Sequence, residues 1–138
     1  MDGAGDGTLW DAYRYALDGA ALDFLVVTDH QSGGAEYTWW RTEKAVDMFD
    51  VPGFFTPVYG TERSVNYPNG HRNLLFAQRG VPILDIGADE RTGKANSGPI
   101  LYPFLRKYNG IATPHSSHTT MGTDWRDKGV ALILDISP

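Results

Sequence analysis

The spacing of apolar residues along the chain predicts three helices. The first covers residues 8–21, where leucine, alanine and tyrosine recur at helical spacing and Asp6 or Thr8 can cap the start. The second covers residues 36–49 and ends before Pro52 and Gly53. The third covers residues 100–108 and ends at Asn109-Gly110, a pair typical of helix C-termini.

Short continuous apolar runs between these helices predict strands that are buried on both faces. We expect strands at residues 24–27, 54–59, 73–77, 111–113 and 130–136, with an irregular loop at 85–98. Strands alternating with helices predict an α/β fold with a mostly parallel sheet. Ligands in such folds bind at the carboxyl ends of the strands, where Asp29, His30, Glu62 and His115 are expected.

Composition narrows the class of protein. The 138 residues fit one domain, which we place at 1–138, and the hydrophobic share of 41% allows a real core. A net charge of −5 gives no basic footprint, so we expect neither nucleic acid nor membrane as a partner. The absence of cysteine excludes disulfides, iron–sulfur clusters and thiol nucleophiles. No signal peptide and no membrane-spanning run is visible, which predicts a soluble, cytoplasmic protein.

All four histidines lie in or beside the loops of one predicted rim of the sheet. Imidazole is the commonest protein ligand for transition metals, and a carboxylate completes such a site. The candidate metal ligands are therefore His30, Glu62, His71, His115 and His118. Each has a plainer interpretation as well, because a histidine after a strand is often a loop or hydrogen-bonded residue, and Glu62 alone is often a solvated charge.

Two further residues have candidate catalytic roles. Asp29 can hold the imidazole of His30 or relay a proton, and it can equally be a helix cap. Arg72 can clamp a phosphoryl oxygen beside a metal, and a surface salt bridge is at least as good an explanation. No phosphate-binding P-loop, GxGxxG, HExxH or GxSxG motif is present.

Several of these segments together resemble one protein family. Residues 22–30 (LDFLVVTDH) resemble the second metal motif of PHP domains (polymerase and histidinol phosphatase). Residues 6–16 (DGTLWDAYRYA), 70–73 (GHRN), 113–115 (TPH) and 121–125 (MGTDW) are closer to one PHP-like group, DUF3604. The resemblance extends over nearly the whole chain.

The resemblance implies a distorted seven-stranded TIM-type barrel with up to three metal ions and hydrolysis of phosphate esters. It implies that His30, Glu62, His71 and His115 are ligands, with His118 less well matched. The His-x-His and Asp-x-His motifs that open and close a PHP site are not in the chain. We therefore expect a partial barrel, one truncated domain whose open edges are completed or covered in a homodimer or higher homo-oligomer.

The sequence thus predicts a metal-dependent hydrolase of small-molecule phosphodiesters or phosphotriesters that uses a metal-activated hydroxide. Zinc is the first choice of metal, and manganese or iron suits the same ligands. Two other hypotheses stay open: a catalytically reduced module for metal binding and oligomerisation, and a hydrolase of carboxylic esters, lactones or amides.

Overall fold

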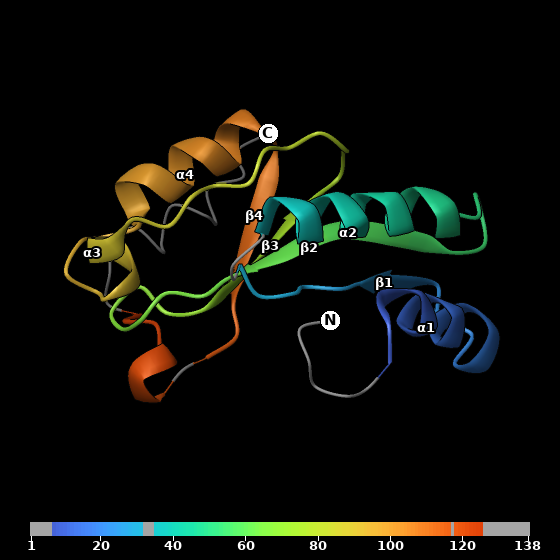
Figure 1. The fold of residues 1–138 in the computed structure, drawn as a ribbon, viewed down its shortest axis with the longest axis horizontal. Helices are drawn as coiled ribbons and strands as arrows, with labels where there is room; N and C mark the ends of the chain where they lie inside the picture. The colour runs from blue at the N-terminus through green and yellow to red at the C-terminus, as the bar shows by residue number, and fades with distance from the viewer. Residues whose placement is uncertain (1–6, 32–34, 117, 126–138) are drawn as a thin grey trace. The chain divides into compact units, whose positions relative to one another are not determined.

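The chain separates into two compact units. The computed structural model describes residues 7–31, 35–116 and 118–125 (Figure 1). The first unit comprises Met1–Thr61 and Leu75–Ile83, and the second comprises Glu62–Leu74 and Leu84–Pro138. The single domain expected over residues 1–138 stays a prediction.

Two of the predicted helices form the helical part of the first unit. The first is split into α1 (Leu9–Arg14) and a π-helix, η1 (Tyr15–Gly19). Thr8 and Asp11 form a capping box at its start, which satisfies otherwise unpaired backbone N–H groups. The second helix is α2 (Ala35–Phe49), in close agreement with the range expected from the sequence.

In the core of the first unit, α1, η1 and α2 pack against Phe55, the residue just before the second strand. One cluster of the unit's buried apolar residues is made up of Leu9, Tyr13, Ala16, Ala45, Val46 and Phe55. The ring of Tyr13 stacks on that of Phe49 with centroids 5.4 Å apart. The buried Trp39 donates from Nε1 to the Val81 carbonyl at 2.7 Å, so its one polar group is satisfied.

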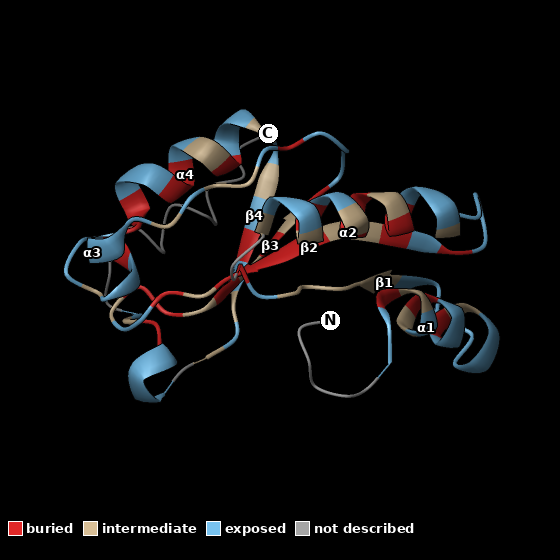
Figure 2. Cartoon of the chain, viewed as in Figure 1, coloured by how far each residue is buried: buried red, intermediate tan, exposed pale blue. Residues whose placement is uncertain are grey.

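The strands of the first unit are β1 (Phe24–Val26) and the greater part of β2 (Thr56–Arg63). They pair in parallel, with Phe24 opposite Thr56 and Val26 opposite Val58. β2 is buried from Gly60 to Arg63 (Figure 2). β1 differs from expectation, since Phe24 is 66% exposed and the strand is therefore not buried on both faces.

The second unit begins with the end of β2 and contains most of β3 (Arg72–Phe76). It continues with α3 (Ala88–Arg91), α4 (Gly98–Lys107), β4 (Gly110–Pro114) and the 3₁₀-helix η2 (Thr119–Met121). α4 confirms the third predicted helix, whereas the loop expected at 85–98 contains the short helix α3. The buried apolar residues of this unit are Val65, Leu74, Leu101, Tyr102, Leu105 and Ala112.

The described strands form one open, mixed sheet in the order β1-β2-β3-β4, so the protein is α/β as predicted. The expected mostly parallel sheet is wrong, because the sheet is mostly antiparallel. Only residues 64–71 join β2 to β3. A parallel connection needs a dozen or more residues, so this link makes a hairpin. The strands described form no closed barrel, and the strand expected at 130–136 lies outside the described residues.

Within the described part of the chain, every helix is too short or too polar to cross a lipid bilayer.

Candidate metal centre

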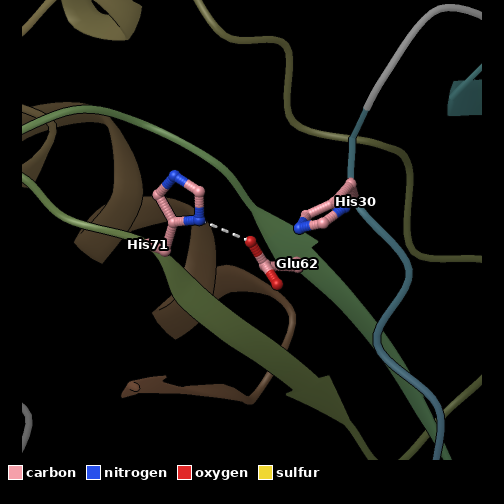
Figure 3. Close-up of side chains that lie close together, drawn as sticks. All are labelled: His30, Glu62 and His71. Carbon is pink, nitrogen blue, oxygen red and sulfur yellow. Dashed lines mark ion pairs between the residues drawn. The ribbon is translucent and has the colours of Figure 1, made fainter. Parts of the chain in front are cut away.

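Glu62 is the centre of a cluster of metal-ligating side chains in the second unit. It lies near the end of β2 and is 7% exposed. Its Oε1 lies 2.7 Å from His71 Nδ1, and its Oε2 lies 3.2 Å from His115 Nε2. The sequence placed Glu62 just after a strand, but β2 is longer than expected and includes it. Each carboxylate oxygen of Glu62 faces a different imidazole. Figure 3 shows the pair with His71.

His71 is held by the loop that connects β2 to β3. Residue Gly70 has φ +74°, a conformation that glycine adopts without strain. The His71 backbone N–H donates to the Met121 carbonyl at 3.0 Å, and the Tyr67 N–H donates to the Thr120 carbonyl at 2.8 Å. These bonds fix the loop against the segment around η2 and direct His71 toward Glu62.

His115 directly follows β4, where the sequence analysis placed it. Its backbone N–H donates to the His71 carbonyl at 3.4 Å, so the two histidines belong to adjacent segments. Their rings meet edge to face with centroids 6.0 Å apart. The side chain of His115 is 36% exposed against 14% for His71, which makes it the solvent-facing member of the cluster. Its Nδ1 lies 3.4 Å from the Ser116 hydroxyl.

His118 has a different local role. It is exposed and precedes η2, and its Nδ1 accepts a hydrogen bond from the Thr119 N–H at 2.7 Å. This is an N-capping contact, which occupies one of the two ring nitrogens. The expectation that His118 is a metal ligand stays a prediction. As a ligand it would bind through Nε2, because Nδ1 accepts the hydrogen bond from Thr119.

His30 and Asp29 belong to the first unit and follow β1. The parallel register of β1 and β2 continues beyond the strand, because the Thr61 hydroxyl donates to the Asp29 carbonyl at 3.3 Å. His30 is exposed, whereas Asp29 is of intermediate burial. The predicted roles of Asp29 in orienting His30 or relaying a proton stay predictions.

Arg72, the expected phosphoryl clamp, is buried and only 2% exposed. Its Nε donates to the Asn69 carbonyl at 3.0 Å, and its Nη1 donates to the Tyr102 hydroxyl at 3.0 Å. These contacts tie the start of β3 to α4 and give the guanidinium a structural role. Nothing in them supports the interpretation that Arg72 reaches a substrate.

The neighbouring Arg63 anchors the end of β2 from the opposite side. It is fully buried and pairs with Glu90, with Nη2 at 2.6 and 2.7 Å from the two carboxylate oxygens and Nε at 3.1 Å. The Leu84 and Asp85 carbonyls accept further bonds from it, and Ser97 donates to Glu90 at 2.5 Å. Burial lowers the pKa of Arg63, and Glu90 acts against that shift.

The donor set suits a divalent transition metal. Two imidazole nitrogens and a carboxylate are ligands that zinc, manganese and iron accept. Two ligand atoms on one tetrahedral zinc ion lie about 3.2–3.4 Å apart, since each is about 2.0–2.1 Å from the metal. Of the two separations measured from Glu62, the one to His115 is 3.2 Å and falls at the edge of that range, whereas the one to His71 is 2.7 Å and would have to lengthen around a metal.

Ser64 and Glu90 are the polar residues around this cluster that the sequence analysis did not single out. The Ser64 hydroxyl donates to Glu62 Oε1 at 2.9 Å. Its position two residues after Glu62 was the available signal, because alternate residues of an extended chain share a face. Glu90 had no such signal, since its partner Arg63 is far away in the sequence.

In comparisons with known protein families, curated proteins and solved structures, the chain matches none. The resemblance to PHP domains therefore stays a prediction.

Proposed function

We propose that this protein is a metal-dependent hydrolase of small-molecule phosphoesters whose metal is held by Glu62, His71 and His115. The observation that carries the proposal is the Glu62 carboxylate, which presents one oxygen to each of two imidazole nitrogens at 2.7 and 3.2 Å. Two histidines that converge on one nearly buried carboxylate offer the nitrogen and oxygen donors that a divalent transition metal takes.

His30 is the fourth proposed ligand. Its support is the register of β1 and β2, in which Asp29 is bonded to Thr61. His30 directly follows Asp29 after β1, at the position where the resemblance to PHP domains implies a histidine ligand. His30 thus adds a third imidazole to the proposed set, while Asp29 keeps its proposed part in orienting it.

A divalent metal in this set supplies a Lewis acid for a phosphoryl oxygen and lowers the pKa of a coordinated water from 15.7 to about 7. The residues of the chain bind and orient that metal. Glu62 contributes the negative charge, and its low exposure strengthens its attraction for a cation. His115, on the exposed side, marks the face from which a substrate approaches. Zinc is the first choice of metal, with manganese or iron as alternatives.

The substrate class that we propose is the phosphodiester or phosphotriester. Such esters carry one negative charge or none, so they need less help from cationic side chains than monoesters do. The burial of Arg72 fits this preference, since its guanidinium bonds Asn69 and Tyr102. The same burial favours the second candidate, a module that binds metal and oligomerises without turnover.

Self-association is part of the proposal, with a homodimer as its simplest form. β1 is the end strand of the described sheet, and Phe24 on it is 66% exposed. An end strand with exposed apolar side chains favours pairing with a second chain. The molar mass in solution, measured by light scattering after gel filtration, tests this point, and a monomer at all accessible concentrations contradicts it.

The metal content of the purified protein tests the function. Elemental mass spectrometry should find at least about one zinc or manganese ion per chain. The Glu62→Gln and His71→Ala variants should lose that metal. Thr92→Ala is the control, because that exposed hydroxyl bonds the Ala88 and Asp89 carbonyls and should leave the metal content unchanged.

The loaded protein is then assayed on nitrophenyl esters of three kinds: phosphodiester, phosphotriester and carboxylic ester. Turnover of the phosphoesters that is lost in His71→Ala supports the proposal. Metal binding without turnover supports the second candidate, the module that binds metal and oligomerises. Turnover of the carboxylic ester alone indicates a carbonyl hydrolase. A protein that takes up no metal refutes all three candidates, since each of them depends on a metal.

A further inference from the structure

Ser64 hydrogen-bonds the carboxylate of Glu62 through its side chain. It directly follows β2 and is half-buried, and its hydroxyl donates to Glu62 Oε1 at 2.9 Å. That oxygen is the one that lies 2.7 Å from His71 Nδ1. Ser64 thus contacts the proposed metal-binding carboxylate.

The backbone explains why Ser64 reaches Glu62. Successive side chains of an extended chain point to opposite faces, so residues 62 and 64 share one face and Arg63 takes the other. Arg63 is immobilised by its pair with Glu90 and is fully buried. Because Arg63 is fixed, the side chains of Glu62 and Ser64 have little freedom to turn away from each other.

The hydrogen bond determines which way the carboxylate faces. Each carboxylate oxygen offers two lone-pair directions, and the last torsion of a glutamate side chain is broad and loosely defined. The Ser64 hydroxyl lies 2.9 Å from Oε1 and His71 Nδ1 lies 2.7 Å from the same oxygen, while Oε2 faces His115. Without the hydroxyl, rotation of the carboxylate would misalign both oxygens together.

We propose that Ser64 is a positioning residue that orients the Glu62 carboxylate and thereby sets the affinity of the site for its metal. The inference rests on the proposed function, since it requires that Glu62 be a ligand. Groups that orient ligands in this way typically change metal affinity about 10- to 100-fold when they are removed.

The experiment measures zinc affinity in competition with a chromophoric chelator, using the full chain and zinc alone. Ser64→Ala should bind zinc about 10- to 100-fold more weakly than the parent protein. Ser64→Thr keeps the hydroxyl and should bind within a few-fold of the parent. Ser64→Val has nearly the shape of Ser64→Thr without the hydroxyl and should match Ser64→Ala. This pair decides the question even if Ser64→Ala fails to fold.

Two further variants separate the possible failures. Thr92→Ala removes an exposed hydroxyl that bonds only backbone carbonyls in the same unit, and it should leave zinc affinity unchanged. Glu62→Gln should abolish tight binding. If the parent binds no zinc, the proposed function fails. If the parent binds zinc, Glu62→Gln does not, and Ser64→Val binds like Ser64→Thr, then the role of Ser64 alone is refuted.

Discussion

Replacing Glu90 with glutamine isolates the worth of the buried ion pair beside the metal centre. The guanidinium of Arg63 is fully buried and Glu90 is 3% exposed, so solvent cannot take over from the lost carboxylate. Glu90→Gln keeps the size of the side chain, removes its charge and turns an N–H₂ group toward a cation. The amide oxygen of the glutamine and the carbonyls of Leu84 and Asp85 would still accept from Arg63, but no carboxylate would balance its charge.

The size of the effect follows from these contacts. Removing one partner of a buried ion pair costs about 3–5 kcal/mol, because a buried charge is left uncompensated. Three nitrogen–oxygen contacts of 2.6–3.1 Å place this pair among the well-formed ones. Since a domain is typically stable by about 5–15 kcal/mol, we expect a large fall in the urea midpoint of Glu90→Gln.

Urea unfolding followed by circular dichroism measures this loss. Asp89→Asn is the matched control, since it removes a neighbouring but exposed carboxylate and should change stability by less than about 0.5 kcal/mol. The double variant Arg63→Met, Glu90→Leu should recover part of the loss, because apolar residues of similar volume can replace a buried pair. A loss below about 1 kcal/mol in Glu90→Gln would refute the reasoning.

Two further predictions concern the backbone at Gly70 and the ionisation of Tyr13. A Cβ at Gly70 would lie 2.1 Å from Thr123 Oγ1, whereas one at Gly80, also at positive φ, would meet nothing within 4 Å. Gly70→Ala should therefore destabilise the protein more than Gly80→Ala does in urea unfolding, and equal losses would contradict the close approach. Burial raises the pKa of Tyr13 to about 12 from 10.0, so the unfolded chain loses that proton first. Stability should fall as pH rises from 10 to 12, by about 2–3 kcal/mol for this group. Tyr13→Phe should weaken that pH dependence, and an unchanged slope contradicts it.

The helices could be predicted because their signals are local. Apolar spacing and end residues determine α2 and α4, and Thr8 with Asp11 determines the start of α1. The direction of the strands could not be predicted in the same way. The apolar runs resembled those of a parallel sheet, but the length of the 64–71 connection decides the pairing.

The length of β2 was underestimated for a related reason. Thr61, Glu62 and Arg63 are polar and look like the end of a strand, yet all three are buried. The pair formed by Arg63 with Glu90 makes this burial possible, and no local pattern reveals a partner so far along the chain. The same distance effect hides the burial of Arg72 against Tyr102.

The candidate ligands could be named from the sequence, because chemistry limits which residues can serve, and their role stays a prediction. Four histidines and a few carboxylates were available, and the structure brings Glu62, His71 and His115 together. His118 was included because it lies close to His115 in sequence, but the local geometry made it a cap. Ser64 was missed, since a hydroxyl becomes informative only when its partner is known.

The way the 64–71 loop is fastened has a consequence for how this protein can change. Three of its bonds to the segment around η2 join peptide groups: Tyr67 to Thr120, His71 to Met121, and Asp124 to Pro68. Peptide groups are the same whatever side chain they carry. Residues 119–121 can therefore vary widely without moving His71, as long as the backbone keeps its path. Natural drift or directed evolution could change these exposed positions while the proposed metal ligands stay in place.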